Sequence, residues 1–243
     1  MNPTGAFLTA EWQDLVMLNY VIEPAVLQPW VPVGTELDFF HGQTFVSVVG
    51  FRFLRTRVLG VPIPGHVNFP EVNLRFYVRH GDRRGVVFVR ELVPRRLIAW
   101  VARVLYGESY LAVPMRERVG VADVRYEWRW GGRWNSVQVT VAGEPADLRV
   151  GSEEEFIAEH YWGYTMRGGV TREYAVEHPR WRVRSAVAAR LDCEVAGLFG
   201  NQFVPVLRGE PSSAFVAEGS PVIVRRGRPL AHPKEHDENT GDR

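Results

Sequence analysis

The sequence is poor in the residues that cross-linking, membrane insertion and amine chemistry require. Cys193 is the only cysteine, so no intramolecular disulfide can form, which favours a reducing compartment. No apolar run approaches the roughly 20 residues that a membrane-spanning helix needs. Residues 1–12 carry neither the basic start nor the apolar stretch of a signal peptide. The sequence therefore predicts a cytoplasmic protein without a membrane partner.

Lysine is nearly absent. All but one of the 29 basic residues are arginine, and the single lysine, Lys234, lies in a polar C-terminal segment. Arginine cannot replace an amine nucleophile, because its guanidinium stays protonated in proteins. A codon bias toward arginine would explain the composition without any functional meaning. Whatever its origin, chemistry that depends on a buried amine has few candidates here.

What is present indicates a folded domain. Hydrophobic residues make up 46% and charged residues 23% of the chain, as in globular proteins, and the formal net charge is +1. Neither a repeat nor a composition break divides residues 1–224, which we predict to be a single domain. Residues 225–243 are polar and carry both signs of charge, and we predict a disordered tail there. Whether the chain forms homo-oligomers is left open by the sequence.

Alternation of apolar and polar residues dominates the secondary-structure signal and indicates half-buried strands. The predicted strands cover residues 15–22, 44–53, 71–79, 85–93, 109–115, 123–130, 133–141, 171–176, 182–191, 214–218 and 222–224. Gly131-Gly132 and Gly81-Asp82 are typical of hairpin turns between neighbouring strands.

Helical signals are few. Residues 94–106 begin with Pro94 and end before Gly107, as a helix does, and Ser152 with Glu155 forms a capping-box pattern. A short helical turn is also predicted after Pro24. Because the predicted strands are numerous, the sheet must pair or cover the edge strands that would otherwise expose unpaired backbone groups. The predicted fold class is therefore mainly β (α+β), an antiparallel, closed or nearly closed cone-like β-barrel with two or three covering helices.

The usual functional motifs are missing. The chain has no Gly-x-Gly-x-x-Gly, no P-loop and no Gly-x-Ser-x-Gly, so dinucleotide, phosphate-loop and α/β-hydrolase functions lack support. Glu155, Glu159 and His160 come closest to a metal-ligand cluster, but a solvated helix face explains them better, and we predict no metal and no cofactor. Aromatic and charged residues alternate in residues 125–134 and so lie on opposite faces of a strand. A single-stranded nucleic-acid platform needs both on one face, so we predict no nucleic-acid partner.

One predicted hairpin carries an unusual polar face. Every second side chain at the start of its first strand is polar, namely Glu71, Asn73, Arg75 and Tyr77. The turn at Gly81 places Glu91, and Arg95 beyond it, near the Glu71 end. Inside a closed barrel, such a face would form a polar, anion-accepting cavity. On the outside, the same charges would simply be solvated, and the alternation does not distinguish the two.

Four separated motifs resemble the YqjF-like family of uncharacterised bacterial proteins: FLTAEW at residues 7–12, FPEVNLRFYV at 69–78, EHYWGY at 159–164 and EHPRW at 177–181. The resemblance covers residues 7–224. It implies a fold related to acetoacetate decarboxylase, a cone-shaped closed β-barrel with a few covering helices and an interior cavity at the strand ends.

The resemblance also bears on the chemistry. Acetoacetate decarboxylase acts through a lysine Schiff base, and its lysine stands in a Pro-Lys-Lys step. The matching step here is Pro94-Arg95-Arg96, in which both amines have become guanidiniums. The resemblance thus implies a fold and a pocket, while the sequence argues against Schiff-base decarboxylase or aldolase activity.

We therefore predict an internal pocket that binds a small anionic carboxylate without Schiff-base chemistry. Its predicted ligand-binding residues are Glu71, Asn73, Arg75, Glu91, Arg95 and Tyr110. The alternative is an enzyme that acts on a small oxo- or hydroxy-acid by acid/base catalysis with Glu71, Glu91 and Arg95. Two further possibilities stay open: Arg95 as a first-turn helix residue that pairs with Glu91, and an interior that is packed solid.

Overall fold

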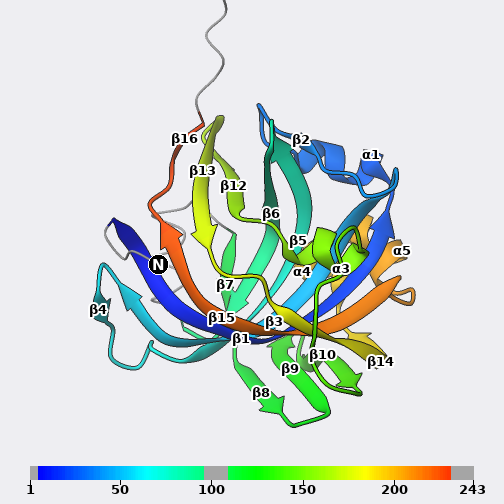
Figure 1. Ribbon diagram of the computed structural model, residues 1–243. Helices are drawn as coiled ribbons and strands as arrows, with labels where there is room; N and C mark the ends of the chain where they lie inside the picture. Colours follow the sequence, from blue (N-terminus) through cyan, green and yellow to red (C-terminus); the bar gives the residue numbers. More distant parts are fainter. Residues whose placement is uncertain (1–4, 96–108, 231–243) are drawn as a thin grey trace, which may run out of the picture.

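The computed structural model describes residues 5–95 and 109–230, and strands dominate it (Figure 1). The strands are β1 (Ala6–Ile22), β2 (Glu36–Leu37), β3 (Thr44–Val58), β4 (Val61–Pro62), β5 (Phe69–His80), β6 (Arg83–Val93), β7 (Tyr110–Ala112), β8 (Met115–Val119), β9 (Asp123–Trp130), β10 (Arg133–Val141), β11 (Ala146–Asp147), β12 (Trp162–Arg167), β13 (Val170–Glu177), β14 (Arg182–Asp192), β15 (Ser213–Arg225) and β16 (Arg228–Pro229). The short helices are α1 (Pro24–Leu27), α3 (Glu153–Ala158), α4 (Val195–Phe199) and α5 (Val204–Leu207), with 3-10 turns η1 (Gln28–Trp30) and η2 (Asn201–Phe203).

Seven of the described strands close into a ring. Their order is β13-β12-β6-β5-β3-β1-β15, and β15 returns to β13 through the pairs Val176–Val224 and Glu177–Ile223. Neighbours in the ring are antiparallel except β12 and β6, which run parallel. A closed ring leaves no unpaired edge among its members. The predicted mainly β, closed architecture is therefore confirmed.

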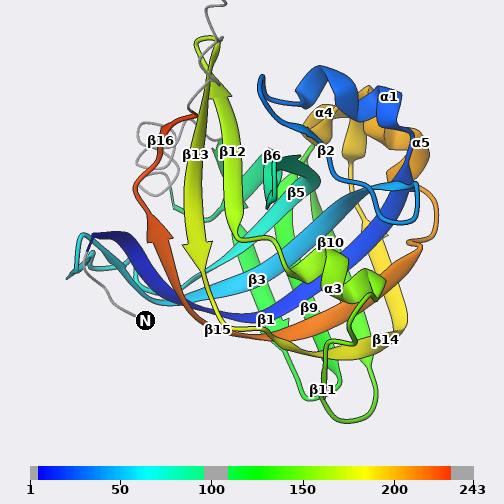
Figure 2. The same ribbon diagram turned by 45° about the horizontal axis from the view of Figure 1, so that its top comes forward.

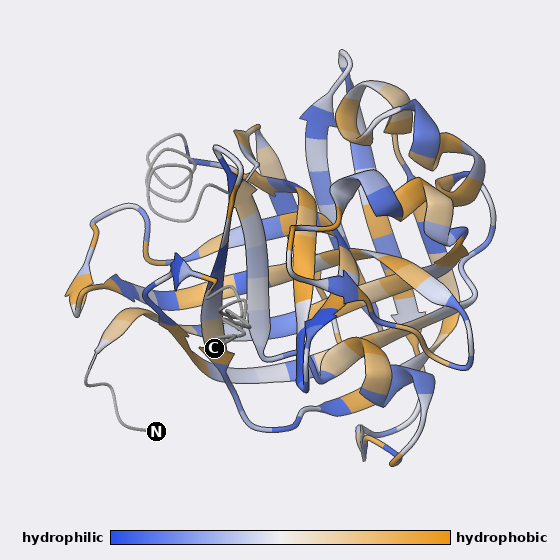
Figure 3. Cartoon of the chain, turned by 90° about the horizontal axis from the view of Figure 1, so that it is seen from above, coloured by the Kyte–Doolittle hydropathy of each residue, from blue (hydrophilic) through white to orange (hydrophobic). Residues whose placement is uncertain are grey.

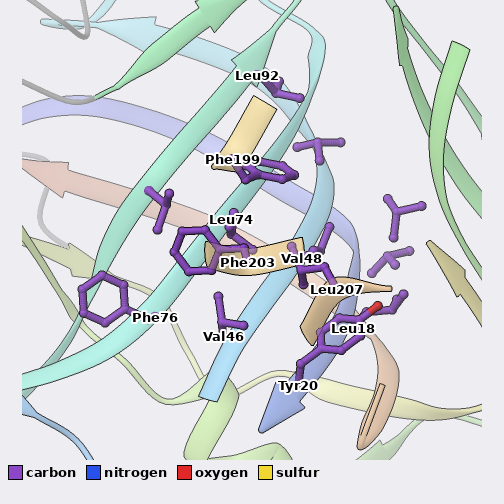
Figure 4. Packing of buried hydrophobic residues seen from close by; sticks show 14 of the residues in the cluster. Leu18, Tyr20, Val46, Val48, Leu74, Phe76, Leu92, Phe199, Phe203 and Leu207 are labelled. Carbon is purple, nitrogen blue, oxygen red and sulfur yellow. The ribbon is translucent and has the colours of Figure 1, made fainter. Parts of the chain in front are cut away.

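A second layer covers part of the outside of the ring. From β15 the sheet continues through β14, β10, β9 and β8, and α4, η2 and α5 lie beside α1 at one side of the molecule (Figure 2). The outer core lies between this layer and the ring. In Figure 4, Phe199, Phe203 and Leu207 of the helical segment pack on apolar side chains of β1, β3 and β5.

Strand β5 is buried on both faces, and this settles which way its polar residues point. Val72, Leu74 and Phe76 are fully buried in the outer core. The alternate residues Glu71 and Asn73 face the interior of the ring, and each is only 2% exposed. Figure 3 shows the same alternation of hydrophilic and hydrophobic residues along the strands. The solvated-face alternative is thus excluded.

The observed bounds of the strands agree closely with the predicted ones in some places and differ in others. The β9–β10 hairpin has the predicted bounds, residues 123–130 and 133–141. The segments predicted at 214–218 and 222–224 form one strand, because Gly219 takes a positive φ of 84° and continues the pairing opposite Gln13. A side chain there would strike Trp12 O, with Cβ only 2.0 Å away.

Other differences concern the start of β1, the C-terminal end of the fold, and elements that were not predicted. Strand β1 begins at Ala6 rather than near residue 15, and β8, β12, α4 and α5 were not predicted. The fold also continues past residue 224, since β16 pairs with β13 and Leu230 is buried. Most of the helix predicted at residues 94–106 lies outside the described residues. Within the described ranges, no helix combines the length and apolar character needed to cross a membrane.

Helix α3 begins as predicted at Ser152, whose hydroxyl accepts a hydrogen bond from Glu155 N at 3.2 Å. The Glu155 carboxylate instead accepts from Gly151 N. Because an N-cap satisfies an otherwise unpaired amide, Ser152→Ala should lower the free energy of unfolding by about 1 kcal/mol. Denaturant melts should show this loss, whereas Ser185→Ala on exposed strand β14 should change stability by less than about 0.5 kcal/mol. Equal losses in the two variants would contradict the capping role.

Candidate functional site

A cavity of about 140 Å³ lies inside the ring, and all seven ring strands contribute to its wall. The lining residues are mostly aromatic and aliphatic, including Trp12, Phe51, Phe53, Phe69, Phe88 and Trp162. Polar side chains enter from β5 and β6, from β7 and from the segment after α3. An apolar cavity of ~150 Å³ can hold a benzene-sized molecule, so this one has room for a small organic compound. The possibility of a solid interior is therefore not supported.

One end of the cavity is a cluster of hydrogen-bonded acidic and neutral groups. Glu71 Oε1 accepts from Asn73 Nδ2 at 3.1 Å, and Glu71 Oε2 accepts from the Tyr110 hydroxyl at 3.2 Å. Glu91 pairs in register with Asn73 across the β5–β6 hairpin and also lines the cavity. Tyr110 arrives on β7, which runs parallel to β6 opposite Glu91. Two carboxyl groups and a phenol thus share this end.

Burial changes the ionisation of this cluster. Loss of water around Glu71 raises its pKa to about 7, against the opposing effects of the Asn73 and Tyr110 hydrogen bonds and the Arg75 charge. Burial, together with the neighbouring carboxylates, also raises the pKa of Tyr110 well above its usual value. Glu71 is therefore poised to hold or release a proton near neutral pH, whereas Tyr110 stays protonated.

Arg75 is a buried cation farther along the same strand face. It is 8% exposed, and its Nη2 donates to Ile157 O at 3.3 Å. No salt bridge joins it to any carboxylate of the described residues, and its buried Nε has no hydrogen-bond partner there. The Arg75 charge acts on Glu71, four residues away on the same strand face, and lowers its pKa, but no salt bridge joins the two side chains. A buried guanidinium without an ion-pair partner is costly, so this end of the cavity favours an anion.

His160 lines the cavity next to Arg75. Its ring lies 4.6 Å from that of Tyr77, centroid to centroid, and its Nε2 lies 3.3 Å from Asp38 Oδ2. Burial lowers the pKa of His160 to about 4, against the opposing hydrogen bond to Asp38. Burial also disfavours the Asp38 carboxylate, but hydrogen bonds from His160 and Arg84 outweigh it and lower the pKa of Asp38. At neutral pH the histidine is therefore neutral and the aspartate ionised.

The structure brings five of the six predicted site residues to one cavity: Glu71, Asn73, Arg75, Glu91 and Tyr110. Arg95 is the exception. It is exposed and lines a separate hollow with Arg52, Pro94 and Glu117, so its predicted place in the pocket is wrong. The chain turns away from the ring interior after Val93, which alternation along the strand could not reveal.

Two cavity residues owe their position to features that the sequence did not reveal. A β-bulge shifts the register between Leu74 and Arg75, so Glu91 faces the same side as Phe88 despite their odd spacing. His160 was predicted to belong to a solvated helix face, and this prediction is wrong. It is 7% exposed and follows the end of α3.

A signal for the missed residues did exist in the four motifs quoted above. Cavity-lining residues that belong to these motifs, other than the predicted site residues, are Phe7, Leu8, Trp12, Phe69, His160 and Trp162. Three of the motifs, at residues 7–12, 69–78 and 159–164, are far apart in the sequence but all contribute to the wall of the cavity. Their common destination, rather than any local spacing, marks them as site residues.

The chain resembles known sequences over most of its length. Residues 9–221 match the DUF2071 family, described as an uncharacterized conserved protein. A relative, the uncharacterized protein YqjF of Bacillus subtilis (strain 168), is 27% identical over 195 residues, which cover 76% of this chain and 79% of the relative.

Similar folds occur among solved structures. The enduracididine biosynthesis enzyme MppR with bound HEPES buffer has a TM-score of 0.68 at 13% identity and covers 92% of this chain and 88% of its own. An acetoacetate decarboxylase-like enzyme from Sphingomonas wittichii RW1 has a TM-score of 0.67 at 15% identity, and the match covers 96% of this chain and 98% of the enzyme. The acetoacetate decarboxylase of Legionella pneumophila has a TM-score of 0.66 at 11% identity, and the match covers 93% of this chain and 88% of the decarboxylase. At such identities the likeness establishes the fold.

Proposed function

The chain belongs to the DUF2071 family and has the acetoacetate decarboxylase-like fold, and from its cavity we propose that it binds a small carboxylic acid with an apolar body. The observation that carries this proposal is Arg75, a buried guanidinium with no salt bridge to a described carboxylate. A ligand carboxylate would supply the missing counter-charge and would meet the planar guanidinium with charge-assisted hydrogen bonds.

The rest of the wall supports the same ligand class. Apart from the polar cluster, the cavity is lined by aromatic rings such as Phe51, Phe53 and Trp162, which would pack on the apolar part of an acid. The volume of about 140 Å³ suits a compound with about six or seven non-hydrogen atoms, by comparison with benzene-binding cavities. We further propose, from the single cysteine, that the protein works in the reducing cytoplasm. From the net charge of +1, we propose that it has no nucleic-acid partner.

Thermal melts with matched ligands test the proposal. Butanoate should raise the melting temperature because it binds the folded state, whereas the uncharged butanamide and the cationic butylamine should not. Mass spectrometry of the purified protein under native conditions should detect any acid that co-purifies. Equal shifts for butanoate and butanamide would show that the cavity does not recognise the charge and would overturn the proposal.

We also propose that the cavity has no Schiff-base activity, because residues 1–233 contain no lysine. Borohydride reduction in the presence of pyruvate or acetoacetate should therefore leave no adduct in peptides covering residues 2–233. Arg75→Lys places an amine in the cavity, where burial lowers a lysine pKa, and provides the positive control. An adduct mapped to residues 2–233 of the wild-type chain would contradict this prediction.

Acid/base catalysis on a small oxo- or hydroxy-acid is the second candidate function. The pKa of Glu71, raised to about 7 by burial, favours it, since a general base works best near the ambient pH. Arg95 plays no part in this version, because it is exposed outside the cavity. Exchange of the α-protons of bound acids in deuterated water, followed by NMR, would support it, and unchanged exchange rates in Glu71→Gln would refute it.

A further inference from the structure

Several buried polar atoms of cavity-lining residues lack hydrogen-bond partners among the described residues, including Trp12 Nε1, Thr56 Oγ1, Asn73 Oδ1, Arg75 Nε and His160 Nδ1. The last two are of opposite kind. Arg75 Nε is a donor, and the ring of His160 presents Nδ1. Both residues line the same cavity and are more than nine-tenths buried. They also share a neighbour, because Tyr77 lies 5.7 Å from Arg75 Cζ and 4.6 Å from the His160 ring. Buried polar groups are normally satisfied, so this pair points to a ligand that complements both.

The tautomer of His160 follows from its partner on the other side of the ring. Asp38 is ionised and can only accept, and it receives hydrogen bonds from Arg84 Nε at 2.7 Å and from His160 Nε2. His160 Nε2 therefore carries the proton. In the neutral ring, Nδ1 must then be a hydrogen-bond acceptor, and no described residue donates to it.

We propose that the ligand is a hydroxy acid, whose carboxylate binds Arg75 and whose neighbouring hydroxyl donates to His160 Nδ1. This inference rests on the proposed function and narrows it to one class of acids. A hydroxyl supplies the donor that Nδ1 lacks, whereas the keto oxygen of an oxo acid would set two acceptors against each other. An unsubstituted acid would leave Nδ1 unsatisfied.

Isothermal titration of the wild-type protein with butanoate, 2-oxobutanoate and 2-hydroxybutanoate tests this selectivity on one carbon skeleton. The hydroxy acid should bind about tenfold more tightly than butanoate, since a buried acceptor gains its partner, and the oxo acid should bind no better than butanoate. Similar affinities for all three would overturn the hydroxyl selectivity and leave carboxylate binding intact. If none of the three binds, the proposed function itself fails.

Two variants assign the selectivity to the histidine. His160→Phe keeps the ring packing but removes the acceptor, so the affinities for butanoate and 2-hydroxybutanoate should become equal within about twofold. Asp38 keeps its bond from Arg84 in this variant. His178→Phe is the matched control: His178 is also buried, but it stacks on Trp181 outside the cavity and should not affect selectivity. A preserved preference in His160→Phe would overturn the assignment.

Asp38→Asn tests whether an acceptor at residue 38 is enough to hold the tautomer. Arg84 Nε and His160 Nε2 both donate to Asp38 Oδ2, so an asparagine oxygen at this position can accept both bonds and keep the ring proton on Nε2. The hydroxy-acid preference should therefore persist in this variant. A merely structural role of Asp38 would lower all three affinities together. Loss of the hydroxy-acid preference in a folded Asp38→Asn would overturn the inference, and the wild-type series decides it even if this variant does not fold.

Discussion

Arg75→Met should weaken butanoate binding by about 30-fold or more, with little loss of stability. Removal of one partner of a buried charge pair typically costs 2–5 kcal/mol of binding free energy, at about 1.4 kcal/mol per factor of ten. The free protein, however, loses only weak contacts: the hydrogen bonds from Nη2 to Ile157 O at 3.3 Å and to Met17 Sδ at 3.9 Å, and the cation–π contact with Tyr77. It also no longer has to bury a cation without a salt bridge, which offsets that loss.

Calorimetric titration and denaturant melts of the same preparations separate the two effects. Arg79→Met provides the control, because Arg79 lies on the same strand, is 51% exposed and pairs with Glu36. That variant should bind butanoate as the wild type does. The cavity proposal is wrong if Arg75→Met retains its affinity within about threefold, or if Arg79→Met loses as much. A large loss of stability in Arg75→Met would instead assign Arg75 a structural role.

Glu71→Gln should stabilise the protein in a pH-dependent manner, by up to about 3 kcal/mol at pH 8. Burial raises the pKa of Glu71 from 4.5 to about 7 in the folded state. The stability that protonated Glu71 contributes is therefore complete below pH 4.5 and is lost as the pH rises through about 7. At about 1.4 kcal/mol per pH unit, this difference gives the stated limit. Glutamine is neutral throughout and avoids the loss.

Denaturant melts of both proteins between pH 5 and 8 measure the effect as a difference. Burial lowers the pKa values of His160 and His178 to about 4, so these groups titrate in both proteins and their contributions cancel. Glu218→Gln is the control for the substitution itself, because the Glu218 side chain is 44% exposed and does not line the cavity. Parallel stability curves for the wild type and Glu71→Gln would show that Glu71 has an ordinary pKa, and would remove the observation that favours acid/base catalysis.

Much of the strand order along the chain could be predicted from the sequence, because it depends on local chemistry. The diglycine at residues 131–132 imposes a tight turn, and the alternation on either side of it gives β9 and β10 with the observed bounds. The short helices α4 and α5 were missed for the opposite reason. Helices of four or five residues are unstable alone, and they form here because Phe199 and Leu207 pack in the outer core.

The composition of the candidate site was also readable, since a period of two assigns Glu71, Asn73 and Arg75 to one face whatever surrounds the strand. Which face is inside was not readable, because the same period holds when the strand is turned over. The second layer of strands and helices decides it by burying Val72, Leu74 and Phe76 on the outside of the ring.

Only the tertiary structure decided the remaining members of the site. The β-bulge that turns Glu91 inward, the exit of the chain that leaves Arg95 exposed, and the arrival of His160 beside Arg75 all depend on segments far apart in the sequence. Asp38 lies 122 residues from His160 in the sequence, yet its hydrogen bond holds the ring proton of His160 on Nε2. The sequence determined which polar groups were available, and the closure of the ring determined which of them meet, because their contacts join strands and loops that local patterns cannot relate.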